Sequence, residues 1–444
     1  MMMSLYAGVS GLKSQQTKLN VIGNNIANIN TTGYKEQTVS FADLLSQTIS
    51  SATGSSSTKG GTNAKQIGLG TNVSAISTNM STGSTQYTGL STDLAIGGNG
   101  FFIVQGGSKG EYQFTRAGNL SVDSSGNLTV NGLEVCGWQD YTAMSDGTYE
   151  FNTQKTVEPL NLYADNKKLM AAKATTEASL MGNLDPTTEA HKTALDAGDD
   201  VDADVTTTMT VYDAQGNSFD VQVNFYKYET GTDTGGSALT TWKWEVASST
   251  SDIDVTNGSG YIQFNSSGDI ITSDTTYSTT PSITLTPSEG GTDAFPITLN
   301  LADIATYTSA SNSGVSVSEI DGYKAGELQD FSIDANGVIT GTYSNGETQP
   351  LAMLGLANFT NPAGLEKIGT NLYVTSTNSG DFTGGVAAGS GGTGSLSSGV
   401  LEMSNVDLAQ EFSEMMITQR AYQANSKVIS TSDDILEILM NMTR

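Results

Sequence analysis

The sequence predicts an α+β protein, mainly β, in which N- and C-terminal helices pair as a coiled-coil-like inner domain. Antiparallel β domains are inserted between these helices. Three observations support this fold class. The stretch from Val400 to Arg444 contains no glycine or proline, although the chain has 50 Gly and 7 Pro in 444 residues. Apolar residues recur every seven positions near both ends. The middle alternates apolar and polar residues between tight-turn signals.

The C-terminal helix is expected to begin near Asn405. The segment Ser404-Asn405-Val406-Asp407 is a capping-box-like pattern with an acid in the first turn. Five apolar residues then follow at intervals of seven: Leu408, Met415, Tyr422, Ile429 and Leu436. Four more apolar residues are expected to widen this line into a stripe: Phe412, Val428, Ile435 and Met440. The helix would be roughly 60 Å long at 1.5 Å per residue, so its stripe needs a partner.

The N-terminal helix, predicted over residues 4–28, carries a similar line of apolar residues: Leu5, Leu12, Leu19 and Ile26. Two such lines suggest a coiled-coil-like pair. The fit is imperfect, because Gln419, Ser426 and Asp433 occupy intervening positions and Gly8, Gly11 and Gly23 each weaken a helix by about 1 kcal/mol. We therefore expect a pair that is weak alone and ordered by many neighbouring copies. Its candidate assembly interface comprises both seven-residue lines and Phe412. Packing in an ordinary core is the alternative, since spacing alone does not distinguish the two.

The remaining chain is expected to run out through β segments and to return through them. Connectors are predicted at 31–72 and 376–404, a β-rich middle domain at 73–150 with 328–375, and inserted outer β domains at 151–327. The terminal helical domain comprises 1–30 and 405–444. Hairpin signals include Asn131-Gly132 and the turn from Asp213 to Asn217, and Trp242-Lys243-Trp244-Glu245-Val246 alternates as a half-buried strand.

The charge of the chain excludes some classes of partner. The formal net charge is −27, and the segment from 151 to 327 has 25 Asp or Glu against 8 Lys, so it holds −17 of that total. Such a surface disfavours binding to nucleic-acid phosphate or anionic membranes. The single cysteine, Cys136, excludes an internal disulfide framework. The first residues lack a basic leader followed by an apolar core, so no Sec-type signal peptide is expected.

No enzyme chemistry is expected, and neither is a cofactor or a metal site. His191 is the only histidine and lies in a polar stretch, so a solvated side chain is favoured over a catalytic one. Cys136 lies in an alternating strand and is expected to pack as a small apolar group. The glycine-rich segments 68–70 and 97–100 do not continue as phosphate loops. The acidic segment 196–204 lacks the glycine and glutamate of an EF-hand. Two interpretations of this segment stay open, a solvated acidic loop and a calcium site, and the loop is favoured.

The segment NNIANINTTGYK resembles the N-terminal signature of the bacterial flagellar axial proteins, which comprise rod, hook and hook-associated proteins. The matching positions are Asn24, Asn25, Ala27, Asn28, Thr32, Gly33, Tyr34 and Lys35. The segments IGGNGFF, FTRAGN and NGLEVCGW are similar to the rod and hook members of this family. TVYDAQGN, the strand TWKWEV and QRAYQANSKVISTSDDIL resemble the hook members in particular.

The resemblance implies a structural subunit that assembles into a hollow, flexible helical tube, a universal joint that passes motor torque to the filament. It implies terminal helices lining the tube, type III export without a cleaved signal peptide, and an extracellular place in the flagellar basal body. Implied partners are many copies of the same chain, rod, hook-cap and hook–filament junction proteins, and the export apparatus. Two alternatives stay open: a distal-rod protein, and a secreted β-rich adhesin with exposed Trp and Tyr platforms that bind carbohydrate.

Overall fold

The computed structural model describes residues 2–55, 59–106, 111–144, 149–232, 238–248, 253–271, 277–288, 293–308 and 314–442. The chain divides into two compact units. The first comprises Met1–Ala164, Asp330–Gly341 and Thr348–Arg444, and the second comprises Asp165–Gln329 and Thr342–Glu347. The protein is mainly β, and its long N- and C-terminal helices contact each other, which confirms the predicted fold class.

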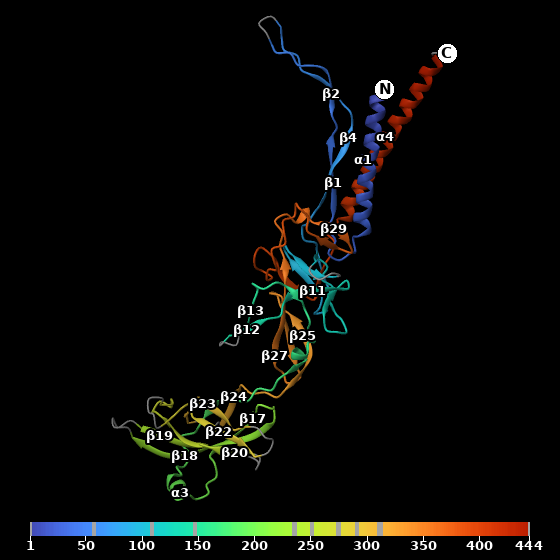
Figure 1. The fold of residues 1–444 in the computed structure, drawn as a ribbon. Coiled ribbons are helices and arrows are strands. Elements are labelled where there is room, and N and C mark those ends of the chain that lie inside the picture. The colour runs from blue at the N-terminus through green and yellow to red at the C-terminus, as the bar shows by residue number, and fades with distance from the viewer. Residues whose placement is uncertain are drawn as a thin grey trace. The chain divides into compact units, whose positions relative to one another are not determined.

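The two long helices of the first unit are α1 (Met2–Ala27) and α4 (Leu408–Met442), which run side by side in Figure 1. The start of α4 differs from the prediction. Asp407 caps the helix, because its carboxylate accepts the backbone N–H groups of Ala409 at 2.8 Å and Gln410 at 3.2 Å. The side chain of Asn405 accepts the Glu36 N–H at 2.8 Å, so it holds the chain before the helix.

A two-part antiparallel ribbon follows α1 and contacts it through β1 and β4 (Figure 1). Its strands are β1 (Gln37–Asp43), β2 (Ser46–Ser50), β3 (Lys65–Gly68) and β4 (Thr71–Thr78). β1 pairs with β4 and β2 with β3, so much of the segment expected to be a connector is paired strand. Its β-branched residues favour extended pairing. Residues 56–58 of the expected connector lie outside the described residues.

The strands of the middle of the first unit are β5 (Thr85–Tyr87), β6 (Leu94–Gly97), β7 (Phe101–Gln105), β8 (Tyr112–Thr115), β9 (Ser121–Val122), β10 (Leu128–Val130), β11 (Leu133–Trp138), β12 (Tyr141–Ala143), β13 (Tyr149–Phe151) and β14 (Glu158–Pro159). The predicted hairpin at Asn131-Gly132 is confirmed. Both residues have positive φ, 52° and 81°, and they join β10 to β11 in a two-residue turn. A core of aromatic and aliphatic side chains, including Phe101, Phe114 and Trp138, fills this sheet.

The returning chain adds further strands to the same unit. They are β27 (Thr348–Leu354), β28 (Leu356–Ala357), β29 (Glu366–Gly369), β30 (Leu372–Val374), β31 (Ser395–Ser398) and β32 (Val400–Glu402), with a 3-10 turn η1 (Pro362–Gly364). β27 pairs with β11, β30 with β8, β31 with β6 and β32 with β5. The outgoing and returning segments therefore share sheets, and the second expected connector, 376–404, contributes two of these strands.

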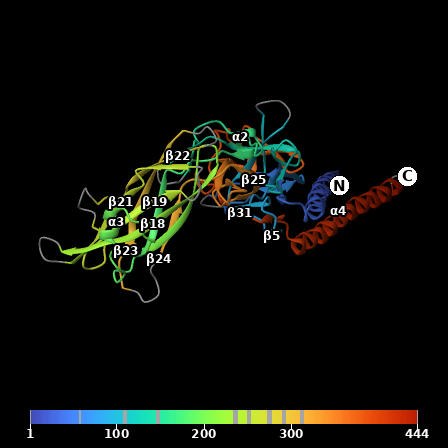
Figure 2. The ribbon, with the colours of Figure 1, turned by 90° about the horizontal axis from the view of Figure 1, so that it is seen from below.

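The second unit begins with α2 (Asp165–Lys168) and also contains α3 (Lys192–Ala197). Its strands are β15 (Leu169–Met170), β16 (Glu177–Asn183), β17 (Val205–Tyr212), β18 (Ser218–Thr232), β19 (Ala238–Ser248), β20 (Ile253–Thr256), β21 (Ser259–Phe264), β22 (Ser282–Pro287), β23 (Phe295–Ala305) and β24 (Gly314–Ile320). β25 (Gly326–Ile333) and β26 (Val338–Tyr343) each have residues in both units. Figure 2 shows the long strands of the second unit from another side.

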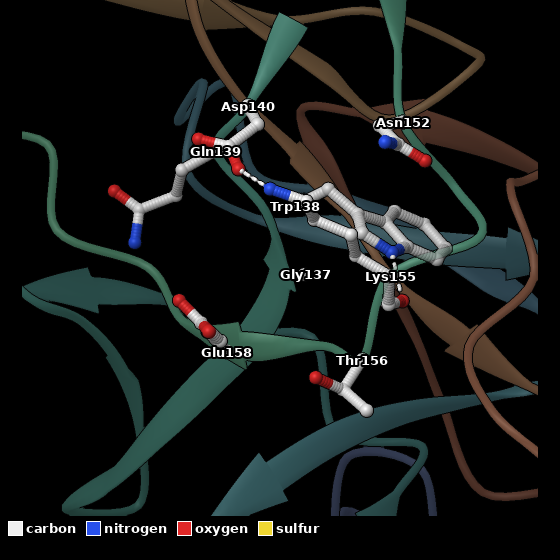
Figure 3. A pocket seen from close by; sticks show the side chains of 8 residues that line it. All are labelled: Gly137, Trp138, Gln139, Asp140, Asn152, Lys155, Thr156 and Glu158. Atoms are coloured by element: carbon white, nitrogen blue, oxygen red, sulfur yellow. Dashed lines mark hydrogen bonds and ion pairs between the residues drawn. The ribbon is translucent and has the colours of Figure 1, made fainter.

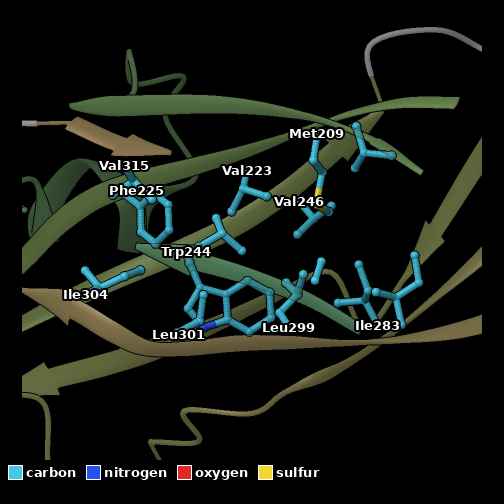
Figure 4. Close-up of a cluster of buried hydrophobic side chains, with 14 of the residues drawn as sticks. Met209, Val223, Phe225, Trp244, Val246, Ile283, Leu299, Leu301, Ile304 and Val315 are labelled. Carbon is cyan, nitrogen blue, oxygen red and sulfur yellow. The ribbon is translucent and has the colours of Figure 1, made fainter. Parts of the chain in front are cut away.

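Two sheets of the second unit share one apolar core (Figure 4). One sheet has the order β17-β18-β19-β21 and the other β20-β22-β23-β16-β24. The turn from Asp213 to Asn217 joins β17 to β18, and Trp242, Trp244 and Val246 alternate inward, as predicted. Within the described residues of this unit, β16 lies parallel to β23. The long chain between these strands makes room for the crossover that a parallel pair requires.

Candidate assembly surface

The contact between α1 and α4 has an antiparallel register, which three pairs define. A Cβ atom added at Gly11 would lie 2.8 Å from Nδ2 of Asn425. Lys18 and Glu414 form an ion pair at 3.0 Å. Asn25 donates to Oε1 of Glu411 at 2.9 Å. Gly8 and Gly11, which weaken helix propensity, therefore allow side chains of α4 to approach the backbone of α1 closely here.

The face of α4 that meets α1 mixes polar and apolar side chains, since a Cβ atom added at Gly8 would lie 3.2 Å from Cγ1 of Ile429. The buried residues of α4 are Glu411, Thr418 and Ser432, and Asn425 continues the same seven-residue spacing. These positions replace Gln419, Ser426 and Asp433, which were expected at the seam and are all exposed. The intervening positions were therefore predicted one residue too late, while Met415, Ile429 and Leu436 of the apolar line are half-buried and alternate with the polar positions. A seam in which one of the two sets of positions is polar buries less apolar surface than a fully apolar one.

The residues predicted as the assembly interface are half-buried or exposed in the single chain. Those of intermediate exposure are Leu5, Leu12, Leu19, Ile26, Met415, Ile429 and Leu436. Three are exposed: Leu408 at 38%, Phe412 at 50% and Tyr422 at 37%. Val428 and Ile435 were expected to widen this line into a stripe. At 100° per residue they lie about 180–200° around the helix from Leu408, so they belong to another face. Helix α4 therefore presents apolar groups on several faces, and α1 covers few of them.

The motif that follows α1 ties both helices to the ribbon. Asn25, which is 1% exposed, accepts the Gln37 N–H at 3.1 Å and the Tyr34 hydroxyl at 3.2 Å. Its amide nitrogen donates to the Gln37 carbonyl and to Glu411, both at 2.9 Å. One buried side chain thus joins α1, β1 and α4. Burial is the largest cause that raises the pKa of Glu411, and the nearby carboxylate of Glu36 adds to it.

The other motif residues shape the turn after α1. Asn24 donates to Tyr34 at 3.1 Å, and Asn28 donates to the Asn24 carbonyl at 2.8 Å. Gly33 has φ of +68°, and a Cβ there would lie 2.8 Å from the Ala117 nitrogen. The carbonyl of Thr32 accepts from Asn371 at 2.8 Å, and Ala27 is exposed. The turn therefore requires glycine at position 33, on both steric and conformational grounds.

Lys35 ends the motif inside a buried cluster of charges. Its ammonium donates to Oε1 of Glu402 and to the Ser81 carbonyl, both at 2.7 Å. Arg116 reaches Oε2 of Glu402 at 3.3 Å, and Gly83 N–H donates to Oε1 at 3.0 Å. The three charged side chains are at most 2% exposed. Burial lowers the pKa of Lys35, and Glu402 opposes that shift.

Sequence reasoning missed Arg116, Glu402 and Glu411 as partners of the motif. Arg116 and Glu402 lie 286 residues apart, so no local pattern relates them. A signal does exist, since Arg116 is the charged residue within the family-like segment FTRAGN and Glu402 the one within VLEM. A charge in an apolar segment indicates a buried pair.

The described residues offer little to support catalysis. A cavity of about 60 Å³ is lined by Trp138, Asp140, Lys155 and five further residues (Figure 3). Lys155 pairs with Asp140, and both side chains are more than half exposed. In the described part of the chain no three His, Cys, Asp or Glu side chains gather as a metal site would require, and the acids of segment 196–204 are included.

The residues weighed for chemistry have structural surroundings. His191 is 27% exposed and lies 3.3 Å from Asp204. Cys136 is fully buried, and burial raises the pKa of its thiol to about 12, so it packs as a small apolar group. The Trp platform that an adhesin would present is missing, because Trp138, Trp242 and Trp244 are all at most 3% exposed. No helix of the described chain is long and apolar enough to cross a membrane.

Four family profiles match segments of the chain in order. They describe the flagella basal body rod protein at residues 5–35, the flagellar hook protein FlgE/F/G D1 domain at 95–154, the flagellar basal body protein FlaE D2 domain at 183–323 and the flagellar basal body rod FlgEFG protein C-terminal region at 397–442. The first of these covers α1 from Leu5 onward together with its motif, and the last contains α4.

Full-length relatives agree with these segments. The chain is 36% identical to the flagellar hook protein FlgE of Treponema pallidum, with 100% of each chain covered. It is 34% identical to FlgE of Salmonella typhimurium, over 99% of this chain and 100% of the relative. A flagellar basal-body rod protein, FlgG of Bacillus subtilis, is 30% identical with 100% of each covered. The solved Helicobacter pylori hook protein FlgE2 is 16% identical, with a TM-score of 0.48 over 72% of this chain and 100% of that one. The chain belongs to the flagellar hook protein family.

Proposed function

We propose that the chain polymerises through its terminal helices into a hollow, flexible tube that passes motor torque to the flagellar filament. The observation that carries this proposal is the apolar surface of α4 that the single chain leaves exposed. Besides Phe412, it includes Met416 at 62%, Ile417 at 68% and Val428 at 41% exposed. Apolar surface of this extent along one helix marks a protein interface.

The predicted interface would then be shared between copies. It comprises Leu5, Leu12, Leu19, Ile26, Leu408, Phe412, Met415, Tyr422, Ile429 and Leu436. The partly polar seam supports this role, because the residues of both apolar lines stay half-buried or exposed in the single chain. The motif from Asn24 to Lys35 would orient the helix pair on its β domain, so that neighbouring copies meet in one register.

The layout of the chain gives each part a role in this proposal. Residues 1–30 and 405–444 form the inner tube domain, and 31–72 and 376–404 join it to the middle β domain of 73–150 and 328–375. The segment 151–327 would supply the outer layer, apart from residues 151–164, which belong to the first unit. The chain would leave the cell through the type III export apparatus without a cleaved signal peptide. Rod, hook-cap and hook–filament junction proteins would be its neighbours in the flagellum.

Electron microscopy of the purified chain tests the proposal. We expect tubes from the wild-type protein and none from Ile417→Ser, which removes exposed apolar surface without disturbing the seam. The matched control Gln419→Ser, also exposed on α4, should assemble normally. Straight, rigid tubes would favour the rod alternative that the Bacillus relative raises. Failure of the wild-type protein to form any tube would overturn assembly by this chain alone.

A further inference from the structure

Helix α4 extends beyond α1. In the antiparallel register, Gly11 faces Asn425 and Asn25 faces Glu411, so the residue numbers of facing positions add up to about 436. Continuing this register places Met2, where α1 begins, opposite about Asp434. The segment Ile435–Met442 of α4 therefore has no α1 residue of its own chain opposite it, and Figure 1 shows the C-terminal end of α4 reaching past α1. We call this segment the α4 extension.

The α4 extension carries one exposed apolar face. Its side chains are Ile435 at 47%, Ile438 at 58%, Leu439 at 42% and Met442 at 78% exposed. At 100° per residue these four positions lie within an arc of about 100°, and the exposed Glu437 and Asn441 lie on the other side of the helix. An apolar stripe of this kind on a helix is typical of a face that another element covers.

A second unpartnered apolar surface lies on α1, on the side that does not meet α4. Met3, Tyr6 and Val9 are 42%, 67% and 53% exposed, and their spacing of three residues keeps them on neighbouring faces. Lys13 follows four residues after Val9 and is exposed. We call these four residues the outer α1 face.

The charges of these two surfaces are complementary. The α4 extension is preceded by Asp433 and Asp434, which are both exposed, and the outer α1 face ends in Lys13. In the part of the chain that the structure describes, none of these three side chains forms an ion pair. An antiparallel helix that sets Asp434 near Lys13 would set Leu439 near Val9 and Met442 near Tyr6.

The two surfaces of one chain cannot meet each other. In its own chain Val9 lies opposite about residue 427, which is twelve residues before Leu439. That separation is roughly 18 Å along a helix that rises 1.5 Å per residue. The partner must therefore come from another molecule with the same pair of surfaces.

We infer that the α4 extension of one copy packs antiparallel on the outer α1 face of a second copy. This inference rests on the proposed assembly and assigns one of its contacts. The contact is heterologous, since a different surface of each copy takes part, so every copy can bind one neighbour through α4 and another through α1. Repetition of such a contact generates a helical array.

Cross-linking between two single-cysteine variants tests the contact. Val9→Cys and Leu439→Cys are prepared separately, mixed in equal amounts, assembled and mildly oxidised, and dimers are then quantified on a non-reducing gel. A disulfide requires Cα atoms within about 7 Å, so only apposed copies react. Cys136 is fully buried and contributes no dimer, which the wild-type protein measures. We expect at least a fivefold excess of dimer in the mixture over either variant alone.

The alternatives give different results. Tubes that form without the mixed dimer would overturn this contact and leave the proposed assembly standing. Equal dimer in the separate variants would also overturn it, because like surfaces would then meet. Absence of wild-type tubes would count against the proposed assembly itself.

If the cysteine variants assemble poorly, reversal of the charges at Lys13 and Asp434 tests the same contact between copies. Lys13→Glu is expected to lower tube yield at least tenfold, and addition of Asp434→Lys in the same chain should restore it. Lys59→Glu, an exposed change in the ribbon, is the matched control and should leave the yield unchanged. No recovery in the double variant, with no mixed dimer, would overturn the inference.

Discussion

Glu402 connects residues from three distant parts of the first unit. It is the last residue of β32, a few residues before α4, and it accepts from Lys35 after α1, from Gly83 and from Arg116. Two cations therefore share one carboxylate in a site that excludes water. A buried pair of this kind adds little net stability over an apolar replacement, but the loss of one partner leaves an uncompensated charge. Its contribution is to fix one geometry at the junction between helices and sheet.

Glu402→Gln should therefore destabilise the monomer by about 3–5 kcal/mol at pH 7, as measured by chemical denaturation. The loss should diminish as the pH rises towards 10. Burial already lowers the pKa of Lys35, and removal of the carboxylate lowers it further. Lysine with a lowered folded-state pKa loses its proton first in the folded state, so folding becomes more favourable with rising pH. Glu150→Gln on the exposed strand β13 is the control. Equal stability of both variants would show that the cluster is not a unit.

Asp321 holds together the two strands that enter and leave the second unit. It accepts the hydroxyl of Thr176 at 2.6 Å and the Glu177 N–H at 2.9 Å, and it pairs with Lys173 at 3.1 Å. Partial burial would raise its pKa, but these hydrogen bonds and the lysine together lower it to about 2. The ionised carboxylate is therefore favoured in the folded state.

The stability that Asp321 supplies should be present above pH 4 and lost as the pH falls towards 2, because the folded-state pKa lies below the unfolded value. Asp321→Asn should cost about 2 kcal/mol at pH 7, and the difference from the wild type should shrink to nearly nothing at pH 2. Denaturation of both proteins across this pH range measures it. Asp303→Asn, at an exposed position, should show no such convergence. A constant difference at every pH would refute the electrostatic account.

At the scale of elements, α4 contacts α1 through polar side chains and Ile429, and it leaves many apolar side chains exposed. Its existence could be predicted, because 35 residues without glycine or proline have few alternatives to a helix. Its contact face could be predicted only in part, since Ile429 was expected there and the polar positions were not. Glu411, Thr418, Asn425 and Ser432 have the same seven-residue spacing as the apolar line from Leu408 to Leu436, and a repeat does not say which line meets the partner within the chain. We predicted the apolar line as the contact because apolar side chains are the ones that are usually buried.

Buried positions of α1 and accessible positions of α4 should respond differently to truncation to alanine. Ile22→Ala, at a site 3% exposed, should destabilise the monomer by about 2–5 kcal/mol. Tyr422→Ala and Leu436→Ala should leave the monomer's melting temperature nearly unchanged and abolish tube formation, since the proposed assembly buries the surface that they leave accessible in the single chain. Melting and tube yield are measured on the same preparations. A large loss of monomer stability at Tyr422 and Leu436, with tubes still forming, would sink the assembly proposal.

The hairpins were predictable and the long-range pairs were not. Asn131-Gly132 and the turn at Asp213 are encoded by adjacent residues, so a local reading suffices. The parallel pair of β16 and β23 depends on residues more than a hundred positions apart, and no turn marks it. The same holds for Arg116 with Glu402. The motif from Asn24 to Lys35 could be located by resemblance, while its partners Glu411 and Glu402 required the structure.

At the scale of the whole chain, the acidic segment and the compact unit have different limits. The composition changes near residue 151, whereas the second unit begins at Asp165. The residues between them belong to the first unit's sheet: β14 pairs with β11, and Leu160 N–H donates to the Val135 carbonyl at 2.9 Å. Val157, Leu160 and Leu162 are at most 2% exposed. Composition marks where surface charge changes, which need not be where the core changes.

Two deletions test whether the inserted unit begins near residue 151, where the composition changes, or near Asp165, where the compact unit begins. Removal of residues 171–325 brings together Met170 and Gly326, which already face each other in the pairing of β15 with β25, so a two-residue Asn-Gly turn can join them. This variant should keep its β signal in circular dichroism and still assemble, because an inserted unit with its own core is separable. Removal of residues 151–327 also takes Val157, Leu160 and Leu162 from the first unit, so it should lower the melting temperature strongly or prevent folding.

The isolated fragment 171–325 completes this test, because it contains the shared core of both sheets and the contacts of Asp321 with Thr176 and Lys173. We expect it to unfold cooperatively and to lose stability between pH 4 and pH 2 as the full chain does, with Asp321→Asn removing that part of the dependence. If both deletions unfold to the same extent, or if the fragment shows no cooperative transition, the second unit is not an independent insertion. In that case the second unit would share its stability with the sheet of the first unit that contains β11.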